Sequence, residues 1–519
     1  MKLLLLLLIC TISLSFAVNL DNGCVVFISD QGNITTNVTG NCGTQAYPCF
    51  TIIDAIQSCK NQSLTAIMTF NFDVGVYTFP NETMGIYRQT ITINGATNGG
   101  TIIDLAQLNN GNVPFLVKEP VNITSHDLTT LSLNNIVWRN LNIQNNTNST
   151  YSFIYSNIGL GKVSVNVNGC TFTNMQFTSQ QGFKTGSVFN LRSSNTTLVV
   201  SNSQFNSIQS GNGAVLYGTF LTANFTDCKF NQIQVGISTI SIVSSYITMS
   251  ECQISNTRSL NFLSVFGETV NAQPNLITNC GFSNNIVTSN LGAQSLIYSI
   301  GSQVIISGSS FVSNQNTLVL FSKTLATQVN SIENSQFISN TASPYIIFSN
   351  ECQNNLTIQG CQFQSNLKAS DGIINLVASN STISNSTFEN NQGPIITPIV
   401  SSVTLNGITT KDNSELIDCV QSNITIEGTS SYDNTDSSMM TCTSCQITAP
   451  SDLDISCTSS YKNDPKNTGI PKGLLVFIVI ASIVVFIILL FTIIKCVLHY
   501  RRKHSHHHHG HHEPLLGHH

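Results

Sequence analysis

One eight-residue pattern recurs along most of this sequence and constrains the fold more than any other feature. Two apolar residues separated by one residue are followed by Asn or Gly, a small residue and finally Phe or another apolar residue, as in Val165 to Phe172. Twelve copies are spaced 21 to 33 residues apart, about 26 on average. A repeat of this length indicates a solenoid or a propeller. The copies end at Ile143, Phe172, Phe205, Phe230, Ile254, Phe282, Phe311, Phe337, Phe363, Phe388, Thr410 and Ser431.

The pattern predicts a strand followed by a corner. Alternation of apolar and polar residues is typical of a strand with one buried face. The alternation slips by one residue at the Asn or Gly, two residue types that tolerate a positive φ. Asp227 and Glu251 occupy this position in two copies. We therefore expect a one-residue left-handed bend in each copy, with the small residue at the corner and the Phe in the interior.

A second apolar run follows most copies, so each repeat contains at least two strands. Examples are the runs that begin at Gly186, Gly213 and Gly292. No amphipathic helix of ten residues lies between the strands, which excludes leucine-rich and βαβ repeats. Propeller blades need about 40 residues per repeat and are too long. The sequence therefore predicts an all-β chain, a right-handed parallel β-helix of about 12 to 14 coils, followed by one C-terminal transmembrane α-helix.

Several segments resemble known parallel β-helix proteins. The Phe-x-x-Asn ends of five copies resemble the repeats of polymorphic outer-membrane proteins, and Gln89 to Gly95 resembles an early coil of the pectin-lyase-like superfamily. The segment from Gly43 to Cys59 is similar to the lead-in of β-helix surface proteins of social amoebae. The resemblance covers about residues 40 to 430 and implies the fold. It leaves the activity open, because that superfamily includes both enzymes and adhesins.

Two apolar segments predict how the chain meets a membrane. Met1 to Ala17 is typical of a secretory signal peptide. The 22 uncharged residues from Gly473 to Ile494 can cross about 30 Å of hydrocarbon as a helix. Basic residues follow this span at Lys495 and at positions 501–503, which predicts a cytoplasmic C-terminus. We expect a single-pass type I protein of the plasma membrane, with an endosomal or lysosomal membrane as the alternative.

These features divide the chain into six expected segments. They are a signal peptide (1–17), a Cys-containing N-terminal cap (18–65), the parallel β-helix (66–431), a Ser/Thr-rich cap and stalk (432–471), the transmembrane helix (472–495) and a His-rich cytoplasmic tail (496–519). Clustered histidines can bind metal ions and gain charge in mildly acidic solution, so the tail holds the metal candidates. These candidates are His506, His507, His508, His509, His511 and His512.

Secretion also predicts two covalent modifications. Thirteen Asn-x-Ser/Thr sequons precede the membrane span and are candidates for glycosylation. Their asparagines are Asn33, Asn37, Asn61, Asn81, Asn122, Asn145, Asn148, Asn195, Asn224, Asn355, Asn380, Asn385 and Asn423. Fourteen cysteines lie in the ectodomain, and two clusters are disulfide candidates whose pairing the sequence leaves open. These candidates are Cys24, Cys42, Cys49, Cys59, Cys442, Cys445 and Cys457.

Other single residues are assigned to the interior or to bends. Cys228, Cys252 and Cys280 occupy the same position in consecutive copies, and we expect a column of inward thiols there. Trp138 has an inward phase and is assigned to the core. Asp227 and Glu251 share one phase, so the alternatives are a cation-binding pair and two solvent-facing bend residues; the sequence favours the latter.

The sequence shows no catalytic constellation. Polysaccharide-cleaving enzymes need clustered carboxylates, and no Asp-Asp or Asp-x-Asp lies within the repeats. Charged residues make up only 9% of the chain and the formal net charge is −5, which argues against nucleic acid as a partner. We therefore expect a non-enzymatic surface protein without a cofactor, for adhesion to or recognition of a carbohydrate or protein. The alternatives are a membrane-tethered polysaccharide lyase or hydrolase and a glycosylated endolysosomal membrane protein.

Overall fold

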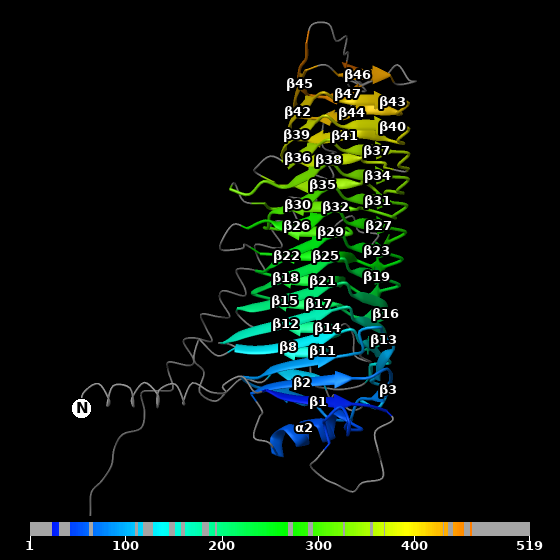
Figure 1. Cartoon of the computed structure of the whole chain (residues 1–519). Helices are drawn as coiled ribbons and strands as arrows, with labels where there is room; N and C mark the ends of the chain where they lie inside the picture. The colour runs from blue at the N-terminus through cyan, green and yellow to red at the C-terminus, as the bar shows by residue number, and fades with distance from the viewer. Residues whose placement is uncertain are drawn as a thin grey trace, which may run out of the picture. The chain divides into compact units, whose positions relative to one another are not determined.

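A computed structural model describes the chain in part. The described residues are 23–30, 42–61, 66–108, 113–117, 128–144, 151–156, 161–178, 186–192, 195–267, 273–288, 294–324, 327–352, 356–367, 369–428, 430–433, 440–450 and 457–458. They form one short helix and three long parallel sheets, here called A, B and C, whose strands succeed one another along a single axis (Figure 1). Each coil contributes strands to the three sheets in turn, so the fold is a parallel β-helix.

Sheet A has 16 strands, and its long strands follow the alternating pattern of the repeat. In β12, for example, Val163, Val165 and Val167 are buried while Ser164 and Asn166 are partly exposed. The strands are β1 (Cys24–Ile28), β2 (Ile67–Phe72), β5 (Thr90–Asn94), β8 (Leu128–Asn134), β12 (Lys162–Asn168), β15 (Thr196–Ser201), β18 (Leu221–Thr226), β22 (Tyr246–Ser250), β26 (Asn275–Thr278), β30 (Val304–Ser307), β33 (Ser331–Glu333), β36 (Leu356–Gln359), β39 (Asn380–Ser384), β42 (Ser402–Asn406), β45 (Asn423–Glu427) and β48 (Gln446–Thr448).

Sheet B has 18 short strands and carries the Phe residues of the repeat. The strands are β3 (Gly75–Thr78), β6 (Thr101–Asp104), β9 (Val137–Arg139), β10 (Asn142–Gln144), β13 (Thr171–Thr178), β16 (Gln204–Ser210), β19 (Lys229–Asn231), β20 (Gln234–Val235), β23 (Gln253–Ser255), β24 (Arg258–Ser259), β27 (Gly281–Ser283), β28 (Ile286–Val287), β31 (Ser310–Val312), β34 (Gln336–Ile338), β37 (Gln362–Gln364), β40 (Thr387–Glu389), β43 (Thr409–Lys411) and β46 (Ser431–Asp433).

Sheet C has 15 strands and corresponds to the second apolar run of each repeat. The strands are β4 (Met84–Ile86), β7 (Phe115–Val117), β11 (Tyr151–Ser156), β14 (Gly186–Leu191), β17 (Leu216–Thr219), β21 (Ser238–Val243), β25 (Asn261–Phe266), β29 (Ile297–Ile300), β32 (Val319–Ser322), β35 (Ile347–Asn350), β38 (Ile374–Val377), β41 (Pro394–Ile399), β44 (Glu415–Val420), β47 (Met440–Thr443) and β49 (Cys457–Thr458). Four coils contribute two strands each to sheet B, so its strands outnumber its coils. Between residues 66 and 431, sheet A has 14 strands with one strand per coil, at the upper end of the expected 12 to 14 coils.

The expected left-handed bend is confirmed at the corner between sheets A and B. The φ angles there are 63° at Gly169, 49° at Asn202, 50° at Asp227 and 57° at Glu251. A second left-handed residue, which the sequence pattern did not predict, lies within sheet B or at its end: Asn174 lies inside β13, Asn256 lies between β23 and β24, and Ser313 follows β31. Asn and Ser fill most of these second positions, because short polar side chains tolerate positive φ better than bulky ones.

Two columns of identical side chains run through the interior of the later coils. Phe282, Phe311, Phe337, Phe363 and Phe388 stack face to face, with neighbouring ring centroids 4.6 to 4.8 Å apart. Three residues after each Phe comes a buried Asn, and these asparagines bond to one another from coil to coil. The side-chain ladder contains Asn285, Asn314, Asn340, Asn366, Asn391 and Asn413.

The structure corrects the phase of one repeat. The copy that the sequence places at Ile143 ends at Trp138, because Trp138 pairs in register with Phe172 and Asn135 forms the left-handed corner with a φ of 56°. The prediction that Trp138 belongs to the core is confirmed, since its side chain is fully buried. Its neighbours are Phe115 and Phe153, which meet it edge to face.

The thiol column is also confirmed. Cys228, Cys252 and Cys280 are buried and unpaired, as are Cys170 and Cys361, at the corner position of the repeat. Each thiol lies within 3.6 Å of a backbone carbonyl oxygen of its own or a neighbouring coil. Burial disfavours the thiolate, and it raises the pKa of Cys170 to about 12 and that of Cys361 to about 11.

A helix and two disulfides close the N-terminal end of the stack. α2 (Ile52–Asn61) packs against β1, and the Thr51 hydroxyl caps it by accepting a hydrogen bond from the Asp54 amide at 3.1 Å. The first disulfide cluster pairs Cys24 with Cys59 and Cys42 with Cys49. β1 belongs to sheet A, so regular β-structure begins inside the segment assigned to the cap.

The second disulfide cluster differs from the sequence candidates. Cys445 pairs with Cys419, a residue that the sequence analysis left out, and Cys442 is also disulfide-bonded. Cys419 lies inside sheet C, which explains why its spacing gave no disulfide signal. Within the described residues, no helix is long and apolar enough to cross a membrane. The expected span at 472–495 and the tail lie outside these residues.

Candidate functional site

The sequence-predicted glycosylation sites that the structure describes lie on different elements of the β-helix. Of the sequons that the structure describes, Asn81, Asn195, Asn380, Asn385 and Asn423 are exposed, Asn224 is partly exposed and Asn61 ends α2. The others, Asn33, Asn37, Asn122, Asn145, Asn148 and Asn355, lie outside the described residues, as do the six histidines. Glycosylation therefore stays a prediction, now with accessible positions.

Asp227 and Glu251 are exposed bend residues, as the sequence favours, and they do not form a metal centre with other ligands. Both sit at the left-handed corner between sheets A and B. No group of three or more His, Cys, Asp or Glu side chains within the described coils could hold a metal ion. The remaining candidate groups for acid–base catalysis are the carboxylates on the outer faces of the sheets.

On sheet B the carboxylates are neutralised by bases. The Asp104 carboxylate accepts hydrogen bonds from Arg139 Nε at 3.0 Å and from Asn140 Nδ2 at 2.8 Å. Partial burial alone would raise the pKa of Asp104, but these bonds and the Ala106 amide lower it below its usual value. Glu389 faces Lys411 at 4.0 Å. The lowered pKa makes the Asp104 carboxylate a poor proton donor.

Sheet C arranges two carboxylates differently. In each coil two consecutive apolar residues point inward, and in β44 these are Leu416 and Ile417. The same doubling is seen at Phe262 and Leu263, whose amides both donate to Leu296 O at 2.9 Å. Because the doubled residues face inward, the side chains before and after them face outward. Glu415 and Asp418 therefore lie on the same outer face although they are three residues apart.

The environment of this pair favours protonated carboxyl groups. Burial is the main cause of the raised pKa of Glu415, the neighbouring Asp418 charge raises it further, and hydrogen bonding from Thr441 opposes the shift. Burial alone raises the pKa of Asp418. Raised carboxyl pKa values without a basic partner are typical of general acids rather than of structural ion pairs.

Two buried side chains beside the pair lack hydrogen-bond partners for their oxygens. Asn375 and Thr397 stand in register with Asp418 on β38 and β41, and only 4% and 6% of their surfaces are exposed. In the described coils, Asn375 Oδ1, Thr397 Oγ1 and Glu415 Oε1 have no hydrogen-bond partner. Leaving such atoms without hydrogen bonds is energetically costly.

An aromatic pair adjoins these residues one coil earlier. Phe348 of β35 is in register with Asn375, and its ring stacks on Tyr345 with centroids 4.4 Å apart. Burial and the charge of Asp371 raise the pKa of Tyr345 to about 12, which keeps its phenol neutral. We call the set Tyr345, Phe348, Asp371, Asn375, Thr397, Glu415, Asp418 and Thr441 the sheet C cluster. It joins an aromatic platform to two carboxyl groups.

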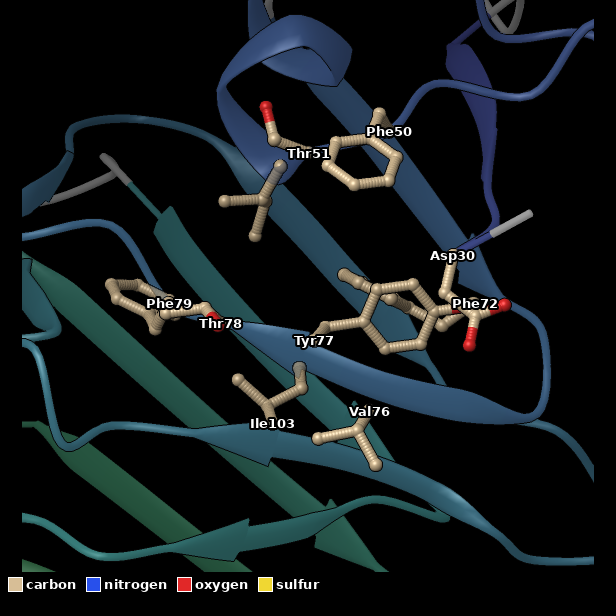
Figure 2. Close-up of a pocket in the computed structure, with 10 residues that line it drawn as sticks. Asp30, Phe50, Thr51, Phe72, Val76, Tyr77, Thr78, Phe79 and Ile103 are labelled. Carbon is tan, nitrogen blue, oxygen red and sulfur yellow. The ribbon is translucent and has the colours of Figure 1, made fainter. Parts of the chain in front are cut away.

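A separate pocket lies at the N-terminal end, between the start of α2 and the first strands of sheet B (Figure 2). It has a volume of about 140 Å³, and its lining includes Phe50, Val76, Tyr77 and Asp30. The Tyr77 hydroxyl donates to the backbone oxygens of Ile28 and Asp73 at 3.3 Å, and burial raises its pKa to about 12. Because the Tyr77 hydroxyl is already bonded to backbone oxygens and the pocket offers one carboxyl group rather than two, the sheet C cluster is the better candidate for a catalytic site.

Comparisons with known proteins agree with this architecture. The sequence matches no protein family and no curated protein. Among solved structures, the catalytic domain of a GH87 alpha-1,3-glucanase has a TM-score of 0.38 at 10% identity, covering 80% of this chain and 70% of its own. A mannuronan C-5 epimerase A-module from Azotobacter vinelandii has a TM-score of 0.26 at 13% identity, covering 76% and 94%. A rhamnogalacturonan lyase has a TM-score of 0.24 at 10% identity, covering 72% and 82%.

The three parallel sheets define the fold as a parallel β-helix. The sequence-based expectation of a non-enzymatic adhesion or recognition protein is contradicted, because the similar structures are mostly carbohydrate-active enzymes. At such low identities the likeness concerns the fold, and no residue role is taken from it. The carboxylates of Glu415 and Asp418 are three residues apart, a spacing outside the adjacent and alternating patterns that the sequence analysis considered.

Proposed function

We propose that this protein is a carbohydrate-active enzyme that cleaves a polysaccharide on the outer face of sheet C. The observation that carries the proposal is the Glu415 and Asp418 pair, two outward carboxyl groups with raised pKa values beside unsatisfied buried oxygens. Cleavage of a glycosidic bond needs one carboxyl group that donates a proton to the leaving oxygen and a second that activates water or attacks the sugar.

The environments of the two groups assign their roles. Glu415 has a buried oxygen, and its pKa is raised both by burial and by the Asp418 charge, so we assign it as the proton donor. The pKa of Asp418 is raised by burial alone. Asp418 ionises more readily when Glu415 is protonated than when Glu415 is charged, so we assign Asp418 as the base or nucleophile. Phe348 is partly exposed and offers a ring against which a sugar can stack.

We also propose that the enzyme is tethered to a membrane with its β-helix outside the cytoplasm. Support comes from the signal-like residues 1–17, from the uncharged stretch 473–494 and from the basic residues behind it. Plasma membrane and endolysosomal membrane remain the two destinations. Imaging an internally tagged full-length chain, with and without permeabilisation, separates them: antibody access in intact cells indicates the cell surface.

The activity is tested with the full-length chain and a panel of soluble neutral and acidic polysaccharides. We expect release of new reducing ends, with Glu415→Gln and Asp418→Asn each lowering the rate at least a hundredfold. Glu389→Gln is the matched control, because Glu389 is a surface carboxylate on sheet B that faces Lys411. Products of unchanged yield from the Glu415→Gln variant would refute this site. Unsaturated products would instead identify eliminative cleavage by the same face.

A further inference from the structure

Partly exposed aromatic side chains recur at one register position on the outer face of sheet C, alternating with small or buried residues, and this position leads to the candidate site. Tyr155, Tyr217, Tyr298 and Phe348 all belong to one register position of successive strands, and we call them the aromatic column. The strand pairings connect every member to the next through one residue per coil. The same position continues through Asn375 and Thr397 to Asp418.

Neighbouring side chains fix the orientation of these rings. The guanidinium of Arg192 lies 4.7 Å from the centroid of the Tyr217 ring, and Arg192 Nε donates to Asn190 Oδ1 at 3.0 Å. Phe266 meets the Tyr298 ring edge to face, with centroids 5.8 Å apart. Rings held in place by such contacts lose little freedom on binding, which favours stacking of a ligand along the sheet.

The charge along this line indicates the class of ligand. Between Tyr155 and Thr441 the register position is occupied by Asn, Ser, Thr, Tyr, Phe and Leu in the described strands, with Asp418 as its single ionisable carboxyl and no Lys or Arg. Asp371 and Glu415 add negative charge near the site. A polymer of uronic acids would be repelled by these carboxylates, and the Arg192 guanidinium beside the column already contacts Asn190 and the Tyr217 ring.

We infer that the aromatic column binds a neutral, extended polysaccharide that lies along the rod axis and leads into the sheet C cluster. This inference rests on the proposed function and specifies its substrate class. Coils stack about 4.8 Å apart. Tyr217 and Phe348 are five coils apart, or about 24 Å, and Phe348 and Asp418 are three coils apart, or about 14 Å. Long chains therefore contact both the column and the carboxyl groups, and short oligosaccharides contact one or the other.

Binding is measured with the full-length Glu415→Gln variant, so that cleavage does not interfere. The probes are soluble neutral glucans that differ in linkage, with polygalacturonate and polymannuronate as charged probes. We expect at least one neutral glucan to bind with little dependence on salt. Adding Tyr217→Ala or Tyr298→Ala should weaken that binding about three- to tenfold by removing a stacking surface. Tyr246→Ala on sheet A, a matched loss of a partly exposed Tyr, should leave binding unchanged.

Each alternative outcome has a defined meaning. Tighter, salt-sensitive binding of a polyuronate, no binding of any neutral glucan, or equal effects of the Tyr246 and Tyr298 variants would overturn the inference. A failure of the proposed function gives a different result. If Glu415→Gln, assayed alone, still releases products while the column variants weaken binding, the binding role of the aromatic column is supported and the catalytic assignment is wrong. If cleavage depends on Glu415 but binding ignores Tyr217 and Tyr298, the catalytic assignment stands and the column fails.

Discussion

The asparagine ladder allows a quantitative prediction for Asn340→Ala. Asn340 Nδ2 donates to Phe311 O at 2.8 Å and to Asn366 Oδ1 at 3.0 Å. Its Oδ1 accepts from the amide of Asn314 at 2.9 Å and from Asn314 Nδ2 at 3.1 Å. Truncation to Ala removes all four bonds at a site with no exposed surface. The backbone amide of Asn340 keeps its own bond to Asn366 Oδ1.

The expected loss follows from these four bonds. A net contribution of about 1 kcal/mol per hydrogen bond gives about 4 kcal/mol. The orphaned Phe311 oxygen and Asn314 amide remain buried, and their desolvation raises the loss to about 4 to 6 kcal/mol. A loss of this size is a large fraction of the stability of an ordinary domain. We therefore expect the ladder to contribute substantially to the stability of the later coils.

The assay is urea denaturation of the full-length chain, followed by far-ultraviolet circular dichroism and by protease resistance of the coils. Gln392→Ala is the control, because this neighbouring side chain is exposed, and we expect a change within about 0.5 kcal/mol. A loss below about 1 kcal/mol for Asn340→Ala would refute the reasoning, since it would mean that water replaces the ladder bonds at no cost.

Three further predictions concern the cysteines and the candidate acid. Cys419→Ser should lower the free energy of unfolding by about 3.5 kcal/mol by opening a 26-residue loop, measured under oxidising conditions; equal stability with and without reductant in the parent would contradict this. The pKa of Glu415 is raised in the folded state, so its ionisation lowers the stability of the parent as the pH rises above the pKa of the unfolded chain. Glu415→Gln should therefore be more stable relative to the parent at pH 7 than at pH 4. A stability difference that does not depend on pH would rule this out. The buried thiols of Cys170, Cys352 and Cys361 should resist alkylation until the coils unfold. Labelling at urea concentrations at which the chain is still folded would contradict this and show that the interior opens.

The coil-forming elements could be predicted because they depend on local chemistry. The alternating strand, the left-handed Asn or Gly corner and the inward Phe each follow from one short segment, and the structure confirms them at Gly169 and Phe172. The early coils were missed because their corner is filled by bulkier residues, as at Ile136, and because Trp138 replaces the Phe.

The candidate site could not be predicted because it depends on pairing across coils. Glu415 and Asp418 have no distinctive spacing in the sequence, and Asn375 is separated from Asp418 by 43 residues. Only the register of sheet C brings these side chains to one place. The visible signal was the pair Leu416 and Ile417, which aligns with the doubled apolar residues of earlier coils and marks the flanking positions as outward.

The uniform register of the coils also has a consequence for how such a protein can change. Each coil contacts its two neighbours, so its stability is close to a sum of neighbour terms, as in a one-dimensional lattice. Phe311 and Phe363 carry the same side chain in the same register on either side of Phe337. Removing or duplicating one whole coil would therefore rejoin matching surfaces. Gene-level gain or loss of 26-residue units would lengthen or shorten the outer face of sheet C while the carboxyl pair stays intact, which makes the reach of the molecule adjustable without rebuilding its chemistry.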